Sequence, residues 1–244
     1  MTLLYLPHYY WGGEYSETTL MGLVLIAVIA VIGFIVQARL QSVFNKYSKV
    51  KFADGMTGAE VAEKMLRDNG ITDVQVLRTA GSLTDHFNPM TKTVNLSDDV
   101  YGSNSVAAAA VAAHECGHAV QHALGYAPLR LRSALVPLTS FSSRYSTWVI
   151  LAGAALMFAT RNEILFWIGI AMVAVSALFS IVTLPVEYDA SRRALAWLED
   201  QEILTDKQQV QAEEALMWAA RTYLVAALSA IAVLIYWLGF LRRD

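Results

Sequence analysis

The chain has little charge and a single cysteine. Only 16% of its residues are charged, against ~25% in soluble domains, and 56% are hydrophobic. This composition excludes an ordinary soluble domain and predicts a membrane protein. One cysteine, Cys116, permits no disulfide within the chain, which fits a catalytic part facing a reducing cytoplasm. A net charge of −3 without a basic block excludes nucleic acid as a partner.

Long uncharged runs predict the membrane spans. Residues 18–38, 164–186 and 222–241 carry no charge, and each is close to the roughly 20 residues that cross a hydrocarbon core. A shorter apolar run crosses only if its helix begins well before it, so we set that span at 134–160. Only residues 161–163 separate this span from the next. We therefore predict about four spans, the second and third forming a tight helical hairpin.

Basic residues predict the orientation. No Lys or Arg precedes the first run, whereas Arg39, Lys46, Lys49 and Lys51 follow it directly. Cytoplasmic flanks of membrane spans carry an excess of basic residues. We therefore expect an extracytoplasmic N-terminus at 1–17 and cytoplasmic segments at 40–133 and 187–220.

A His-Glu-x-x-His motif lies in the first of these cytoplasmic segments. His114 and His118 are four residues apart, so on a helix both imidazoles share one face and can converge on one zinc ion. Glu115 points elsewhere on the helix, where it can act as general base toward a metal-activated water. The alanine-rich run before the motif favours a helix, which Ser103 or Ser105 can cap. The alternative is two histidines packed in a core.

Catalytic zinc takes three protein ligands, so one more residue is needed. The class with a third His six residues after the second is excluded, because Leu124 holds that position and Gln121 stands where that class has Gly. Glu187 leaves the end of the third span, where a carboxylate is costly unless it is paired or bound to metal. A helix-end glutamate exposed to water is the alternative. Asp189 and Ser191 could then orient a ligating imidazole through its other ring nitrogen.

The segments HECGHAVQH (114–122) and EYDASRRA (187–194) resemble the bacterial membrane zinc metallopeptidases often labelled YugP-like, which are distantly similar to HtpX and the prenyl-protein proteases. The resemblance implies that His114, His118 and Glu187 are the zinc ligands and that Glu115 is the catalytic base. The chain differs from the better-known relatives at one position that would hold a ligand in place. The better-known relatives carry an acidic residue four positions after the ligand Glu, where this chain has Ser191.

Two nearby side chains have simpler interpretations. His122 lies one turn beyond His118, and all three histidines would not readily reach one ion from a straight helix. It is either a residue near the substrate or ligands, or a helix-face histidine without a role. Cys116 points to another helix face and is interpreted as a packed small residue rather than a ligand or redox group.

Residues 57–99 read as a small α+β unit beside the motif. Thr57 and Glu60 form a capping-box signature for a helix that Gly70 closes. Strands follow, with a hairpin turn at 88–89, and an edge strand there could bind substrate backbone. Asp85 and His86 could face the cleft, although turn chemistry explains them equally well.

An oxyanion stabiliser completes the predicted site. Arg221 and Tyr223, at the membrane entry of the last span, are the first candidates, and we choose Tyr223. Tyr188 and His86 are the next. A tyrosine at that depth also fits the aromatic belt of a membrane interface.

The sequence therefore predicts a mainly α, polytopic membrane protein with about four transmembrane helices and a small α+β zincin-like catalytic part. We expect a zinc-dependent endopeptidase, one Zn²⁺ per chain, in the cell membrane with its site facing the cytoplasm. Its substrates would be membrane-associated or misfolded proteins, and its partners the lipid bilayer and an oligomer or accessory protein. The alternative is a non-catalytic membrane adaptor with a structural zinc site, and a transporter is less consistent with the sequence.

Overall fold

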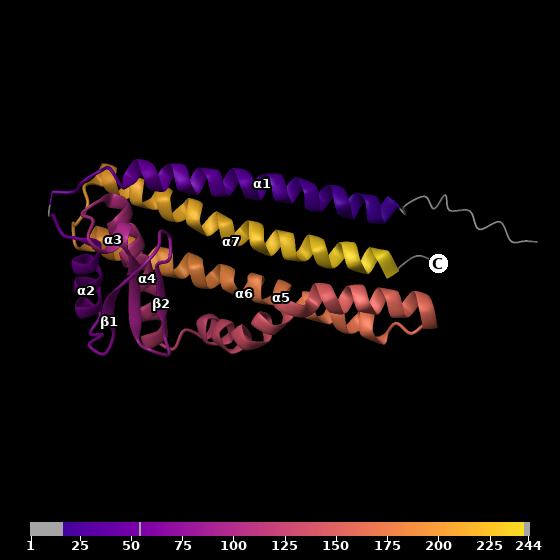
Figure 1. The fold of residues 1–244 in the computed structure, drawn as a ribbon. Helices are drawn as coiled ribbons and strands as arrows, with labels where there is room; N and C mark the ends of the chain where they lie inside the picture. Colours follow the sequence, from indigo (N-terminus) through magenta and orange to yellow (C-terminus); the bar gives the residue numbers. More distant parts are fainter. Residues whose placement is uncertain (1–16, 54, 242–244) are drawn as a thin grey trace, which may run out of the picture.

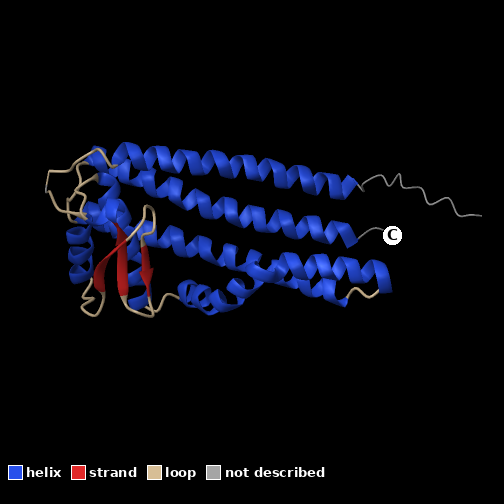
Figure 2. Ribbon diagram, viewed as in Figure 1, coloured by secondary structure: helices blue, strands red, loops and turns tan. Residues whose placement is uncertain are grey.

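The computed structural model describes residues 17–53 and 55–241, so the predicted extracytoplasmic segment lies almost wholly outside the described residues. Helices dominate (Figure 1), and a small sheet lies at one end (Figure 2). In chain order the elements are α1 (Glu17–Tyr47), α2 (Gly58–Asp68), β1 (Gln75–Thr79), β2 (His86–Asn88), β3 (Thr93–Ser97), α3 (Asp98–Tyr101), α4 (Val106–Ala123), α5 (Ala127–Thr160), α6 (Ile164–Asp200) and α7 (Asp206–Leu241).

The four long helices lie side by side in the order α1, α7, α6, α5 (Figure 1). Extensive packing joins α1 to α7, α7 to α6 and α6 to α5, while α5 otherwise packs only lightly, against α4. We call the end that carries the sheet the sheet end and the other the far end. The α5–α6 connection lies at the far end, where α1 begins and α7 ends. One whole side of α5 is therefore without a neighbour in the part of the chain that the structure describes.

Three of these helices, α1, α6 and α7, are long and apolar enough to cross a membrane. The expectation of about four spans is thus matched by three, and α5, which contains the predicted span 134–160, is not among them. The reason is the polar stretch 139–147, TSFSSRYST, which interrupts the apolar character of α5. Pro137 also lies inside this helix, and Figure 1 shows α5 bending along its length.

The predicted hairpin between 134–160 and 164–186 is confirmed. Residues 161–163 join α5 to α6 without a helical turn of their own. Gly153 and Gly169 let the two helices approach closely, because a Cβ at Gly153 would lie 2.5 Å from the Phe166 nitrogen and one at Gly169 2.5 Å from the Ile150 side chain. Small residues at such contacts are typical of packed membrane helices.

The sheet end is built around α4. This helix is almost entirely buried, with Ala107–Ala110, Ala112 and Ala113 at 0% exposure, so that its small side chains let neighbouring elements pack closely. Ser105 caps its start by accepting a hydrogen bond from the Ala108 amide, as predicted. The capping box of Thr57 and Glu60 on α2 is also confirmed.

The sheet has the order β1-β3-β2, with β1 parallel and β2 antiparallel to β3. The β2–β3 pair is the predicted hairpin, with Phe87 opposite Val94. Val94 and Leu96 on β3 are fully buried in the core that α2, α4 and the end of α6 share. Strand β2 is left at the edge of the sheet next to α4.

Candidate metal centre

The two motif histidines lie on α4, four residues apart, and their rings meet edge to face with centroids 4.8 Å apart. His118 is buried and His114 is partly buried. The helix forms here because Ser105 caps it, because alanines fill its first turns, and because Gly125, at φ +62°, follows its end. The predicted motif helix is thus present with both imidazoles on one face.

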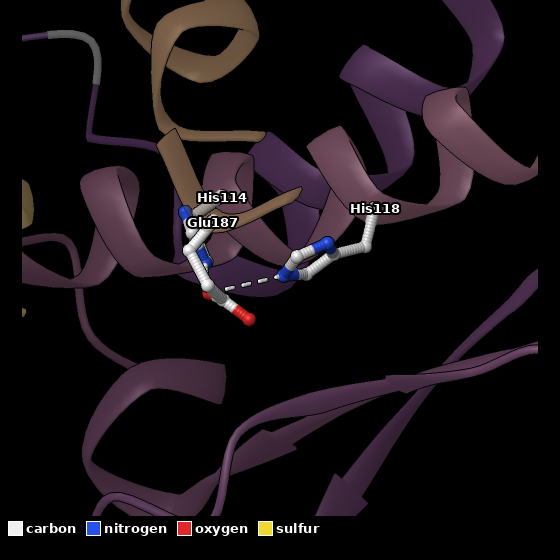
Figure 3. A group of neighbouring side chains, drawn as sticks. All are labelled: His114, His118 and Glu187. Carbon is white, nitrogen blue, oxygen red and sulfur yellow. Dashed lines mark ion pairs between the residues drawn. The ribbon is translucent and has the colours of Figure 1, made fainter. Parts of the chain in front are cut away.

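Glu187 on α6 completes the cluster. Its Oε2 lies 3.3 Å from His114 Nε2 and 3.5 Å from His118 Nε2, and Figure 3 shows the three side chains converging. Zinc bonds of 2.0–2.1 Å at tetrahedral angles would bring ligand atoms to roughly 3.3–3.4 Å from one another. The three residues therefore have the spacing and the donor types of a metal site.

The carboxylate of Glu187 supports the same interpretation. The residue is only 1% exposed, and neither of its oxygens has a hydrogen-bond partner among the described residues. A buried carboxylate without such partners is costly, and a divalent cation removes that cost. Arg132 on α5 contributes one contact, its Nη1 lying 3.4 Å from Glu187 Oε1. This arrangement holds one oxygen toward Arg132 and leaves Oε2 for the histidines.

The outer nitrogens of both imidazoles have partners from the chain. Ser191 Oγ lies 3.1 Å from His114 Nδ1, as the sequence suggested. His118 Nδ1 lies 3.1 Å from Gln121 Oε1, and the Gln121 amide donates to Asp189 Oδ2 at 2.9 Å. Asp189 therefore supports His118 through Gln121 rather than directly. These contacts fix the ring orientations that metal binding needs.

Asp189 is itself held by two arginines. Arg192 and Arg193, three and four residues further along α6, both donate to its carboxylate. Gln121 also donates to the carbonyl oxygen of Val186 at 2.8 Å, which ties α4 to the turn of α6 that carries Glu187. The support of the cluster is thus one network across the α4–α6 contact.

Glu115 lies beside the cluster at 8% exposure. Its Oε2 accepts a hydrogen bond of 2.9 Å from the Phe87 amide, which belongs to the edge strand β2. The outer edge of β2 therefore faces the motif helix. The bond holds the carboxylate in one orientation and leaves its other oxygen free of this contact.

A cleft of about 230 Å³ opens in front of these residues. Tyr223 and His86 line it, whereas Tyr188 lines a separate groove between α6 and α7. Arg221 lies outside the cleft, stacked over the Trp218 ring at 4.2 Å. Among the oxyanion candidates, the structure therefore brings only Tyr223 and His86 to the cleft. Its lining is Asp85, His86, Phe87, Pro89, Glu115, His118, Leu129, Arg132, Ser133, Glu187 and Tyr223.

Asp85 also lines this cleft. Its carboxylate accepts hydrogen bonds from the Ser97 amide at 2.7 Å and the Ser97 hydroxyl at 3.0 Å, which fasten the start of β2 to the end of β3. Burial raises the pKa of Asp85, although the hydrogen bonds from Ser97 act in the opposite direction.

Two other residues of α4, His122 and Cys116, do not line the cleft. His122 is exposed and rests against the Phe87 ring, with centroids 5.7 Å apart. Cys116 is fully buried, its Sγ 3.5 Å from the Ala62 carbonyl oxygen, and burial raises the pKa of its thiol. Both agree with the simpler interpretations of these side chains.

Sequence reasoning missed Arg132, Gln121 and Phe87. One feature of the sequence could have indicated Arg132. It is a charged residue just before a predicted membrane span, and in a hairpin of the two helices it lies level with Glu187. Gln121 is three residues after His118, which is within reach of its ring on a helix. The Phe87 contact uses a backbone amide, so no residue type could have marked it.

Comparison with known proteins agrees with the geometry. A family model described as "Putative neutral zinc metallopeptidase" matches residues 22–242. The "Putative membrane protease YugP" of Bacillus subtilis (strain 168) is 38% identical over 208 residues, covering 84% of this chain and 91% of that protein. No solved structure shows a significant match to the chain. With a family model that spans nearly all of it and a relative of this identity, the chain belongs to the neutral zinc metallopeptidase family.

Proposed function

We propose that this protein is an integral-membrane zinc endopeptidase that holds one Zn²⁺ with His114, His118 and Glu187. The observation that carries the proposal is the buried Glu187 carboxylate, whose Oε2 lies 3.3 and 3.5 Å from the two imidazole nitrogens and which has no hydrogen-bond partner among the described residues. A zinc ion bound there would supply Lewis-acid activation of water. A structural zinc site generally has four protein ligands, and this cluster offers three beside an acidic side chain. The adaptor alternative is therefore less well supported.

Glu115 is the proposed proton carrier. It faces the same cleft as Glu187, and the Phe87 amide holds one of its oxygens in place. The carboxylate takes a proton from the attacking water and returns it to the nitrogen of the leaving amine. Tyr223 supplies a hydroxyl on the cleft wall for the oxyanion of the tetrahedral intermediate. Arg132 acts as a positioning residue for Glu187.

Strand β2 is the proposed binding edge for substrate backbone. It is an outer strand, and the outward amide of Phe87 meets Glu115 beside the cleft. An extended peptide added along this edge would pass its backbone in front of the proton carrier. This geometry suits a protein or peptide substrate in extended form.

The site is proposed to lie at the cytoplasmic membrane surface. Arg39 of α1 and Arg221 of α7 both contact the ring of Trp218, so the apolar runs of these helices end at one level. Basic residues gather after this level on α1, which by the positive-inside rule marks the cytoplasmic side. The cleft lies at that end of the bundle, within reach of proteins embedded in the bilayer.

If α1, α6 and α7 cross the membrane, the path of the chain requires α5 to make a fourth crossing. Helix α6 starts at the far end, and the chain reaches that end from α4 only through α5. Residues 134–160 would then cross despite their polar stretch. We therefore retain the proposed segments: 1–17 outside, spans at 18–38, 134–160, 164–186 and 222–241, and cytoplasmic parts at 40–133 and 187–220.

A direct test compares Glu115→Gln with the parent protein in lipid vesicles. We expect both to bind one zinc per chain and only the parent to hydrolyse a casein-like or membrane-anchored substrate, in a chelator-sensitive way. Glu63→Gln, at an exposed position of α2 that does not line the cleft, is the matched control and should retain activity. Equal hydrolysis by Glu115→Gln and the parent would refute the proton-carrier role. A full zinc content after Glu187→Ala would refute the ligand set.

A further inference from the structure

Helix α5 carries a polar strip on its unneighboured side. Ser133, Ser140, Arg144 and Thr147 are all exposed, and Pro137 lies among them. Their spacing of three, four and seven residues places them on one helix face. The opposite face, with Ser142, Ser146 and Ile150 buried, packs against α6. Beyond Ser133, which lines the cleft, the strip therefore points away from the rest of the described chain.

Arg144 lies at mid-depth of the helix bundle. Arg132 contacts Glu187, and further along the same pair of helices Ile150 meets Gly169. This antiparallel register places Arg144 level with Val175, halfway between Ile164 and Glu187. The distance to either end is about 18 Å at 1.5 Å per residue. An arginine side chain is much shorter than this, so its guanidinium cannot reach either membrane surface.

An arginine at that depth needs a partner. Arg144 makes no hydrogen bond or ion pair with any residue that the structure describes. An arginine that faces lipid at this depth is costly, so such residues face protein or water. Aromatic side chains flank it: Phe141, Tyr145 and Trp148 are 58%, 42% and 70% exposed. Exposed Arg, Tyr and Trp side by side are typical of the centre of a binding surface.

A second copy of this chain does not fit the strip. An α5–α5 pairing about a two-fold axis would bring the two Arg144 side chains toward one another. The apolar runs of the other long helices, 18–38, 164–186 and 222–241, contain no acidic residue that could meet Arg144 at its depth. A carboxylate that pairs with Arg144 at this depth therefore belongs to a different protein.

The strip continues into the cleft, and this continuity indicates which class of protein supplies the carboxylate. Arg132 and Ser133, near the start of α5, line the cleft, and the strip begins at Ser133. Pro137 lacks an amide hydrogen, so the Ser133 carbonyl does not receive the usual helical hydrogen bond from the residue four positions ahead. A membrane helix lying along the strip would lead its polypeptide directly into the cleft.

We propose that the α5 strip docks the transmembrane helix of a protein substrate that carries Asp or Glu near its middle, with the carboxylate paired to Arg144. The proposal rests on the peptidase function proposed above and names its substrate class. In a helical substrate the acidic residue would lie roughly 12 residues from the level of the cleft, because α5 and the substrate helix rise equally. The pair would be shielded from water, where charge complementarity selects one partner over another.

The experiment uses the full chain in lipid vesicles with synthetic single-span helices that share one cleavable tail. The helices differ at a single mid-membrane position, which is Glu, Leu or Lys, and the free tail peptide is the soluble comparator. We expect the parent to cleave the Glu helix at least tenfold faster than the Leu helix. Arg144→Leu should abolish this preference and leave hydrolysis of the free tail within twofold. Arg144→Glu should shift the preference to the Lys helix.

Arg161→Asn is the matched control, because it removes an exposed arginine from the far end of the same segment at a left-handed position that Asn tolerates. It should behave as the parent. Equal cleavage of the Glu and Leu helices by the parent would overturn the proposal, as would a preference that survives Arg144→Leu.

A binding measurement separates this proposal from the peptidase function. A photoreactive side chain at position 148 in the Glu115→Gln protein should label the Glu helix far more than the Leu helix. Loss of free-tail hydrolysis in the parent would refute the peptidase function alone, while equal labelling of both helices, or labelling of lipid only, would refute the docking surface.

Discussion

Gly117 of α4 lies directly against Ala190 of α6. A Cβ at Gly117 would be 2.6 Å from the Ala190 carbonyl oxygen and 3.1 Å from its carbonyl carbon. This contact is between His114 and His118 on one helix and next to Glu187 on the other. The spacing of the three-residue cluster therefore depends on an interhelical approach that only glycine permits.

Gly117→Ala should push the two helices apart. We expect a loss of about 1–3 kcal/mol of stability, typical of overpacking, and a lower zinc content. Thermal unfolding in detergent and metal analysis measure both. Gly102→Ala is the matched control, because nothing lies within 4 Å of a Cβ there. Unchanged zinc content in Gly117→Ala would contradict the close-approach argument.

Gln121→Leu should weaken metal binding. The substitution leaves His118 Nδ1 and Asp189 without the amide that joins them, and removing such support typically costs 10–100-fold in metal affinity. Competition with a chromogenic chelator measures the change. His122→Gln, one residue further along the same helix and exposed, should bind zinc as the parent does. Equal affinity for Gln121→Leu would contradict the role of Gln121 in supporting His118.

Tyr223→Phe tests the oxyanion assignment. Removing one such donor usually lowers kcat by about 100- to 1,000-fold, and KM and zinc content should stay the same because the ring still fills the cleft wall. Steady-state kinetics on a quenched peptide separate kcat from KM. Tyr188→Phe, in the groove between α6 and α7, should have no effect. A selective rise in KM would instead make Tyr223 a substrate-binding residue.

Asp85 should give stability a pH dependence of defined sign. Its pKa is raised by burial in the folded state, so its proton is held more tightly there than in the unfolded chain, whose value is about 3.9. The stabilising contribution is complete below that value and is lost as the pH rises through the folded pKa. The melting temperature of the parent should therefore fall relative to that of Asp85→Asn as the pH is raised above about 4. A constant difference across this range would contradict the shift.

The sequence predicted those parts of the site that depend on local spacing. His114 and His118 follow from helix periodicity, and Glu187 follows from the cost of a carboxylate at the end of an apolar run. The capping of α2 and α4 and the β2–β3 hairpin were predicted from short-range chemistry as well. Each of these features involves a few neighbouring residues or one strong energetic constraint.

The sequence did not predict contacts between distant elements. Arg132 meets Glu187 because the α5–α6 hairpin has a particular register, and the Phe87 amide meets Glu115 because β2 is an edge strand. Neither depends on a side-chain pattern within one segment. Only three of the four expected spans have the hydropathy of a membrane helix, because the polar stretch 139–147 lies within the fourth.

The order of the cluster along the chain has a consequence for biosynthesis. His114 and His118 precede the α5–α6 hairpin and Glu187 lies on its second arm, so this third residue can join the histidines only after the chain up to Glu187 has been made and folded back. A ribosome-bound chain shorter than this lacks the complete triad. In the proposed topology, the nascent protein would complete this cluster only after the hairpin has formed.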